Sequence, residues 1–184
     1  TDPYQPIERE WKVTRSILEV LAETRHPFSI VTKNALVERD LDLIAPMAAA
    51  GLARVYLSIT TLDADLARKL EPRASAPARR VNALRALAGA GVPTGVMVAP
   101  VILEAILESA AAAGATQAGW IMLRLPREVA PLFRDWLATH YPDRAAHVMS
   151  LVNDLRGGQD YDSGFGTRMR GTGVFADLIA RRFE

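Results

Sequence analysis

Three polar side chains next to short apolar segments are the first candidates for chemistry. Lys33 ends the segment FSIVTK, and Ser58 and Thr60 lie at the end of the segment RVYLSIT. A lysine that is shielded from water can act as a Schiff-base nucleophile at neutral pH, whereas a lysine beside a carboxylate forms an ion pair. A run of hydroxyls suits a ribose or a phosphate, but serine and threonine also begin loops because they hydrogen-bond to nearby backbone groups. Both interpretations stay open for these positions.

Two loops contain the remaining polar candidates. Glu71 and Arg73 lie in EPRASAP, a loop that two prolines stiffen. Such a loop can hold a carboxylate and a guanidinium facing a ligand, or Glu71 and Arg73 can form an internal clamp that holds the loop itself. The opening stretch TDPYQP contains Asp2, Tyr4 and Gln5. A polar loop that runs into a helix usually continues a strand in an α/β protein, so we predict a preceding strand that is absent from the sequence.

Other polar groups carry weaker signals. Pro100 and Arg124 fall at or near the ends of apolar segments. The segment FGTRMRGTG weakly resembles a loop that contacts phosphate or nucleic acid, although the charge from residue 156 to the end is nearly balanced. The three histidines, His26, His140 and His147, lack the spacing of metal ligands, and we interpret them as structural.

The elements that must position these side chains alternate between helix and strand. Apolar residues at helical spacing predict a first helix over 7–23, and short β-branched apolar segments predict buried strands. The predicted strands cover 28–33, 54–59, 94–100 and 117–126, and the later helices cover 40–50, a short helix from 64, 77–90, 103–114, 127–139 and 174–183. We expect Asp63 to cap the helix from 64 and Pro77 to open the next one. The alternation predicts an α/β fold, a parallel sheet wrapped by helices, with ligands at the carboxyl ends of the strands.

Two places in this pattern are irregular. Pro46 falls inside the predicted helix over 40–50, so this helix must kink or begin later. The strand over 94–100 enters the next helix almost without a loop, although βα connections usually have about 2 to 6 residues. We therefore predict that a loop between Ile102 and Leu103 is missing from the sequence.

Composition excludes several classes of function. The 184 residues carry a net charge of +1, which gives no general electrostatic reason to expect nucleic acid or a membrane surface as a partner. Neither an apolar run of about 20 residues nor a signal peptide is present, so we expect a cytoplasmic protein without a membrane partner. The absence of cysteine excludes disulfides, thiolate zinc sites and cysteine-bound iron–sulfur clusters within these residues. We expect one domain over 1–155, followed by a glycine-rich tail and a short helix over 156–184.

Several longer stretches carry a family resemblance. TDPYQPIE, IVTKNALVERDLDLIAPMA, the segment from VYLSITTLDAD through LEPRASAPARR to VMVAPVI, and YDSGFGTRMRGTG together resemble radical S-adenosylmethionine proteins of the spore photoproduct lyase-like group. The resemblance covers nearly the whole chain. It implies a partial (β/α)6 TIM-like barrel of parallel strands with outer helices, whose N-terminal strands are missing from this chain. It also implies a 4Fe-4S cluster bound by a three-cysteine loop, S-adenosylmethionine, and reductive cleavage of this molecule to a 5′-deoxyadenosyl radical that abstracts hydrogen from a substrate.

The resemblance assigns eight side chains to the cofactor site, all on loops or strand ends at one edge of the barrel: Asp2, Tyr4, Gln5, Lys33, Ser58, Thr60, Glu71 and Arg73. The opening loop, including Thr1, would contact the methionyl amino and carboxylate groups. The strand end at Ser58 and Thr60 would contact the ribose, and Lys33 would face the interior beside the ligand. Catalytic residues and metal ligands are not assigned, because the cysteine loop is absent.

The missing cysteines leave more than one function open. The chain is either a fragment of a complete lyase-like enzyme, which alone would be inactive, or a relative that has lost the chemistry. The complete enzyme would need S-adenosylmethionine and an electron donor such as flavodoxin or ferredoxin, and its unknown substrate could be related to nucleic acid. The alternatives are a Schiff-base lyase that uses Lys33 and a degenerate barrel that serves only as a binding module.

Overall fold

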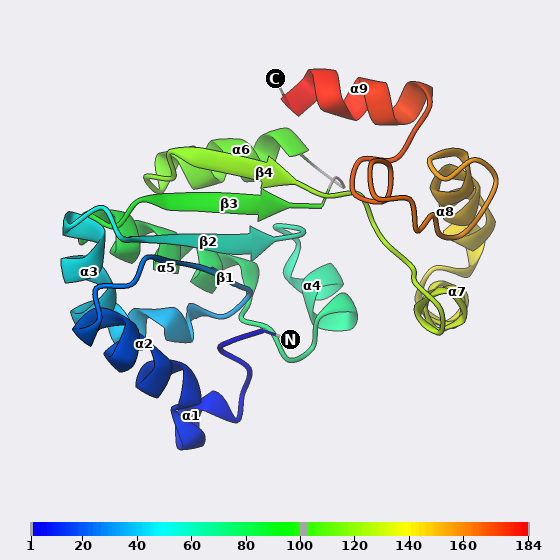
Figure 1. Ribbon diagram of the computed structural model, residues 1–184. Helices are drawn as coiled ribbons and strands as arrows, with labels where there is room; N and C mark the ends of the chain where they lie inside the picture. Colours follow the sequence, from blue (N-terminus) through cyan, green and yellow to red (C-terminus); the bar gives the residue numbers. More distant parts are fainter. Residues whose placement is uncertain (1, 100–102, 184) are drawn as a thin grey trace. The chain divides into compact units, whose positions relative to one another are not determined.

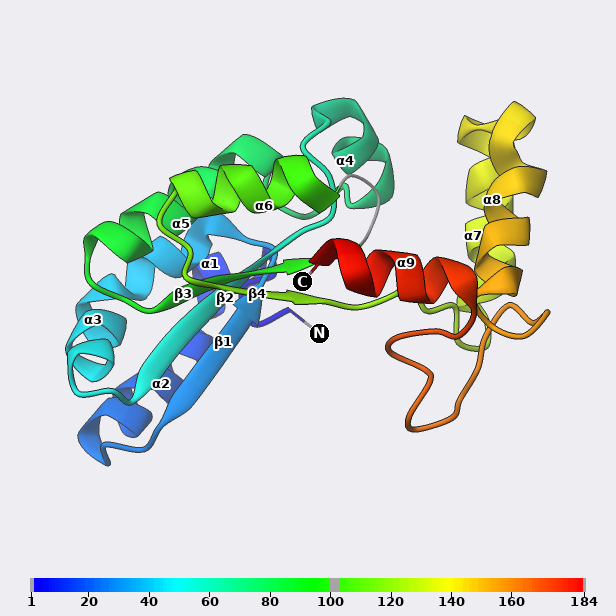
Figure 2. The ribbon, with the colours of Figure 1, turned by 90° about the horizontal axis from the view of Figure 1, so that it is seen from above.

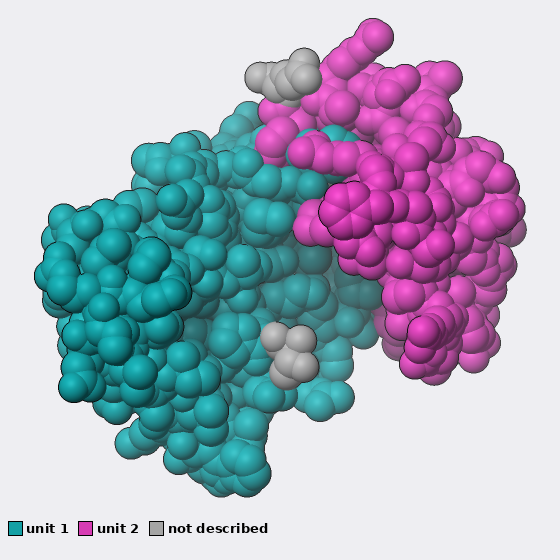
Figure 3. All heavy atoms as spheres, viewed as in Figure 1, with its two compact units in different colours: residues 1–120 teal, residues 121–184 magenta. Residues whose placement is uncertain are grey.

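The computed structural model describes residues 2–99 and 103–183, and they form two compact units. Unit 1 comprises Thr1–Trp120 and unit 2 comprises Ile121–Glu184 (Figure 3). The predicted boundary at 155/156 therefore falls inside unit 2. Thr1, Pro100 and the predicted missing loop between Ile102 and Leu103 fall on or next to positions outside the described residues.

Unit 1 contains a parallel four-stranded sheet in the order β1-β2-β3-β4 (Figure 1). The strands are β1 (Phe28–Thr32), β2 (Ala53–Ile59), β3 (Thr94–Val98) and β4 (Gln117–Trp120). Each strand is followed by at least one helix, which is the connection that parallel strands require. The α/β fold with a parallel sheet is thus confirmed.

Helices cover one face of this sheet. They are α3 (Leu41–Ala49), α5 (Pro77–Gly89) and α6 (Leu103–Ala112), with α2 (Val13–Glu23) packed on α3 (Figure 2). The core beneath them consists of alternate strand residues such as Val55, Leu57 and Val96, each at most 1% exposed. The predicted cap at Asp63 is confirmed, because its carboxylate accepts from two backbone N–H groups of α4 (Ala64–Leu70). The predicted helix start at Pro77 is also confirmed, because Pro77 is the first residue of α5.

The opposite face of the sheet carries Tyr56 and Met97 above two glycines. A Cβ atom at Gly95 would overlap the Tyr56 ring, and one at Gly119 would lie 2.8 Å from the Met97 sulfur. The Tyr56 hydroxyl bonds to the side chain of Gln117 on β4. The Tyr56 ring therefore extends from β2 across β3 to β4, and only a residue without a side chain fits beneath it.

Two predicted elements differ from the structure in unit 1. The helix predicted over 7–23 is broken into α1 (Glu8–Trp11) and α2 at Lys12, whose φ of 51° is left-handed. The break is fixed by the Glu8 carboxylate, which accepts from the backbone N–H of Thr14 in the first turn of α2 at 2.9 Å.

A 3-10 helix, η1 (Ala35–Asp40), precedes α3, and Pro46 lies inside α3.

The strand predicted over 117–126 is also too long, because the chain leaves the sheet after Trp120. Beyond that point its backbone bonds within unit 2: the Met122 N–H donates to the Met169 carbonyl, and the Leu123 carbonyl accepts from Arg156. A strand that continued to residue 126 could not make these bonds.

Unit 2 consists of three helices and the glycine-rich segment. The helices are α7 (Val129–His140), α8 (Pro142–Asp154) and α9 (Val174–Phe183), and the sequence pattern does not predict α8. A small core lies mainly between α7 and α8: Leu125, Ala130, Leu137, Met149 and Val152, with Phe133, Trp136, Ala145 and Val148 packed against it. In the described part of the chain, no helix has the length and apolar character needed to span a membrane.

Candidate functional site

The Glu71 carboxylate joins two cations at the carboxyl end of the sheet. One oxygen accepts from the Lys33 ammonium at 2.6 Å, and the other accepts from the Arg80 guanidinium at 2.6 Å. Lys33 follows β1, Glu71 follows α4, and Arg80 lies in the first turns of α5. We call these three side chains the Lys33–Glu71–Arg80 network.

Arg80 holds this network to the protein interior. It is 1% exposed, and its other bonds go to the carbonyls of Ser75 (2.7 Å) and Ser58 (2.8 Å). One guanidinium thus connects α5, the loop over 71–76 and strand β2. Because its partners include a carboxylate and two carbonyls at good distances, the buried charge is both paired and hydrogen-bonded.

Glu71 remains ionised in this setting. Burial acts to raise the pKa of its carboxyl, but the hydrogen bonds from Lys33 and Arg80 act in the opposite direction, and the pKa lies below its ordinary value. The side chain of Lys33 is 42% exposed, while that of Glu71 is 9% exposed. Lys33 is therefore the member of the network that a ligand can reach.

The 71–76 loop is fixed to the residues after β1. The Ser75 hydroxyl donates to the Asn34 side-chain oxygen at 3.0 Å and accepts from the Ala35 N–H at 2.9 Å. The Ser75 N–H donates to the Lys33 carbonyl at 3.3 Å. The loop positions Glu71 through these bonds rather than through its prolines alone.

Asp2 fastens the opening loop to the same strand end. One of its oxygens accepts from the Thr32 hydroxyl (2.6 Å) and the Tyr4 N–H (2.8 Å), and the other accepts from the Lys33 N–H (2.7 Å). Both oxygens of the carboxylate are therefore used within the protein. Gln5, its neighbour in the loop, is exposed.

Tyr4 is fully buried and faces away from solvent. Its hydroxyl donates to Asp40 at 3.0 Å, and Asp40 also accepts from Arg39 and Arg15. Burial, followed by the nearby Asp40 charge, raises the pKa of Tyr4 well above its ordinary value. For Asp40, burial would raise the pKa, but the hydrogen bonds from Arg39 and Arg15 lower it. This cluster anchors the opening loop.

Ser58 and Thr60 differ in how they are satisfied. The Ser58 carbonyl accepts from Arg80, and its side chain is half-buried. The Thr60 hydroxyl oxygen is buried and has no hydrogen-bond partner among the described residues. An unpaired buried hydroxyl is uncommon in proteins, so Thr60 is a position where a further partner would be accommodated.

Of the two interpretations of the 71–76 loop, the internal clamp between Glu71 and Arg73 is wrong. Arg73 is exposed and makes no hydrogen bond or ion pair with any described residue, while Glu71 pairs with Lys33 and Arg80 instead. The ion-pair interpretation of Lys33 is confirmed. Sequence reasoning missed Arg80, although a signal existed: Arg80 lies on the same face of α5 as the buried Ala83, Leu84 and Leu87.

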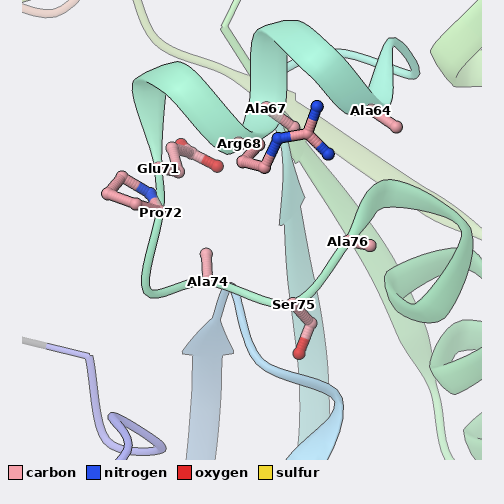
Figure 4. Close-up of a pocket in the computed structure, with 8 residues that line it drawn as sticks. All are labelled: Ala64, Ala67, Arg68, Glu71, Pro72, Ala74, Ser75 and Ala76. Carbon is pink, nitrogen blue, oxygen red and sulfur yellow. The ribbon is translucent and has the colours of Figure 1, made fainter.

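A cavity of about 200 Å³ lies between α4 and the 71–76 loop (Figure 4). Its lining is small and mostly apolar, with three polar side chains: Ala64, Ala67, Arg68, Glu71, Pro72, Ala74, Ser75 and Ala76. The Glu71 carboxylate thus borders both the cavity and the Lys33 ion pair. Among the residues the structure describes, no group of three or more His, Cys, Asp or Glu is arranged to hold a metal ion.

Comparisons with known proteins give relatives without an assigned activity. No family model matches the chain. An uncharacterized protein of Mycobacterium bovis is 34% identical over 160 residues, which cover 82% of this chain and 47% of that protein. Uncharacterized proteins of Methanocaldococcus jannaschii (33% identical; 58% of this chain, 39% of that protein) and of Acidianus two-tailed virus (37%; 54% and 32%) are also similar. The chain spans about half or less of the length of these relatives.

Proposed function

We propose that this chain forms the S-adenosylmethionine-binding side of a radical S-adenosylmethionine enzyme of the spore photoproduct lyase-like group, with a partial (β/α)6 barrel and the iron–sulfur cluster held by residues outside these 184. The observation that carries the proposal is the Lys33–Glu71–Arg80 network at the carboxyl end of a parallel sheet, on stretches that carry the family resemblance. That edge is where parallel α/β folds bind their ligands.

The residues of this chain do not fit an iron–sulfur cluster. The sequence contains no cysteine, and thiolates are the usual ligands of such clusters. A protein as long as the curated relatives has room for the cysteine loop outside the matched region.

S-adenosylmethionine fits the edge in part. Lys33 has two N–H donors beyond its bond to Glu71, and its side chain is accessible, so we assign it to the carboxylate of the ligand. Ser58 and the unpaired Thr60 hydroxyl suit the ribose. The full internal bonding of Asp2 and the burial of Tyr4 make them residues that hold the loop, not residues that contact the ligand.

The chain's contribution to the reaction is binding and orientation. Lys33, Ser58 and Thr60 would hold S-adenosylmethionine, which after one-electron reduction and release of methionine would supply the 5′-deoxyadenosyl radical for hydrogen abstraction. Glu71 keeps the Lys33 ammonium in one place, and Arg80 keeps Glu71 ionised and fixed. A binding group that does not have to reorganise retains more of its interaction energy.

The test uses the full-length protein that contains this chain, reconstituted anaerobically with iron and sulfide. Dithionite and S-adenosylmethionine should yield 5′-deoxyadenosine, and absence of both cluster and product would refute the proposed function. In the same protein, Lys33→Met should weaken S-adenosylmethionine binding about tenfold, the usual loss for one hydrogen bond to a charged group. Lys69→Met on α4 is the matched control, and an equal loss there would refute the assignment of Lys33.

A further inference from the structure

In unit 2, the Arg124 guanidinium has no carboxylate partner among the residues that the structure describes. Arg124 is half-buried, and its two terminal nitrogens donate to the Met169 sulfur at 3.6 Å and to the Tyr161 hydroxyl at 3.2 Å. Its Nε is buried without a partner, and no carboxylate of the described residues forms an ion pair with it. A thioether and a phenol are neutral and weak acceptors, so they leave the charge of Arg124 uncompensated.

A second guanidinium adds to this positive charge. Arg156 is 5% exposed and donates to the carbonyls of Leu123 (2.8 Å) and Arg168 (2.8 Å). Burial lowers the pKa of Arg156, the charge of Asp162 opposes this, and the nearby charge of Arg124 lowers the pKa further. Arg156 donates to the carbonyl of Leu123, the residue before Arg124, so the two cations belong to the same part of unit 2, and the charge of Asp162 acts on Arg156.

The glycine-rich segment is held around these cations. Arg156 donates to the carbonyls of Thr167 and Arg168 in this segment. The Arg168 guanidinium lies over the Phe165 ring, 5.0 Å from the ring centroid. The Asp162 carboxylate is used locally, since it accepts from the Gly164 N–H at 2.7 Å and from the Thr167 hydroxyl. Arg168 has no carboxylate partner among the described residues either.

We propose that Arg124, together with the Tyr161 hydroxyl and the field of Arg156, binds a phosphate-bearing anion in unit 2. The Tyr161 oxygen accepts from Arg124, which leaves its O–H hydrogen to donate to an oxyanion. The planar guanidinium suits bidentate contact with a phosphate. A dianion balances two guanidinium charges better than the single, locally bonded Asp162 does. The proposal concerns unit 2 alone and does not depend on the proposed function.

The phosphate can belong to a small molecule or to a nucleic-acid backbone, and the test separates these sources. Binding of inorganic pyrophosphate, and of a single-stranded oligothymidylate, is measured on the full chain at constant ionic strength. If pyrophosphate and the oligonucleotide compete for the same site, the site accepts the phosphodiesters of a nucleic-acid backbone in addition to small phosphates. Pyrophosphate binding without oligonucleotide binding would assign it to small phosphate esters.

The variants locate the site. Arg124→Gln should weaken pyrophosphate binding about tenfold, and Arg124→Lys, which keeps the charge without the planar fork, should weaken it less. Arg144→Gln, an exposed arginine on α8, is the matched control and should bind as the wild type does. Absence of pyrophosphate binding by the wild type, or equal weakening by Arg124→Gln and Arg144→Gln, would overturn the proposal. If Arg124→Gln unfolds, an affinity of Arg124→Lys equal to that of the wild type would overturn it.

Discussion

Arg80 in unit 1 and Arg156 in unit 2 are both buried arginines, but their charges are balanced differently. Arg80 bonds to a carboxylate and two carbonyls, whereas Arg156 bonds to three carbonyls. The Lys33–Glu71–Arg80 network is therefore complete within the protein apart from the exposed Lys33, while unit 2 keeps net positive charge at Arg124 and Arg156. Arg80 therefore organises a site through its ion pair, whereas the uncompensated charge of Arg156 attracts anions to unit 2, in line with the proposed anion site.

Removal of the Arg80 guanidinium is expected to have the largest effect on stability. Arg80→Met removes one partner of Glu71 and leaves the carbonyls of Ser58 and Ser75 unpaired. Breaking a buried ion pair from one side typically costs about 3–5 kcal/mol, and we expect a loss of that size in the free energy of unfolding of unit 1. Urea denaturation measures it. Arg79→Met, whose exposed side chain pairs with Glu38, is the control and should have little effect.

A smaller effect is expected for the corresponding change in unit 2. Arg156→Met removes the donor of the Leu123 and Arg168 carbonyls, whereas the Thr167 carbonyl keeps two backbone N–H donors. Because no carboxylate loses an ion pair, we expect a loss of about 1–3 kcal/mol in the free energy of unfolding of unit 2. Urea denaturation followed by the fluorescence of Trp136, which packs against the unit 2 core, reports this. A loss as large as that of Arg80→Met would contradict the distinction between the two arginines.

The smallest effect concerns pH. The pKa of Glu71 is lowered in the folded protein from an ordinary value of 4.5, so its ion pairs contribute stability above pH 4.5, and this contribution is lost as the pH falls through the lowered pKa. Glu71→Gln should therefore show a shallower decline of stability below pH 4.5 than the wild type. The pKa of Asp40 is also lowered, so protonation of Asp40 destabilises both proteins at low pH and part of the decline in stability remains in Glu71→Gln.

Urea midpoints measured as a function of pH test this expectation. Glu108→Gln, at an exposed position of α6, is the control and should follow the wild-type curve. Identical curves for Glu71→Gln and the wild type would mean that Glu71 is not stabilised in its ionised form.

Local signals were sufficient for much of the fold and insufficient for the site. The positions of the four strands, the Asp63 cap and the start at Pro77 depend on neighbouring residues, and the sequence predicts them, although the strand predicted over 117–126 already ends at Trp120. The break at Lys12 depends on Glu8, whose carboxylate is also bound by Arg39, 31 positions away. Such contacts leave no periodic signal.

The candidate side chains show the same contrast between local signals and contacts that are distant in the sequence. Lys33 and Glu71 could be named because each lies in a loop at a strand or helix end, but their pairing joins positions 38 residues apart. The resemblance assigns Asp2 and Tyr4 to ligand contacts only by the place of their loop in the order of strands. The structure places Thr32, Lys33 and Asp40 against them, so both are satisfied internally.

The glycine beneath Tyr56 has a consequence for how this sequence can vary. Because a side chain at position 95 would overlap the Tyr56 ring, positions 56 and 95 constrain each other. An alanine at 95 requires either a shift of the Tyr56 ring or a smaller residue at 56, and in both cases the bond to Gln117 is disturbed. We expect these three positions to change together during evolution, as a linked set on the face of the sheet that carries Tyr56.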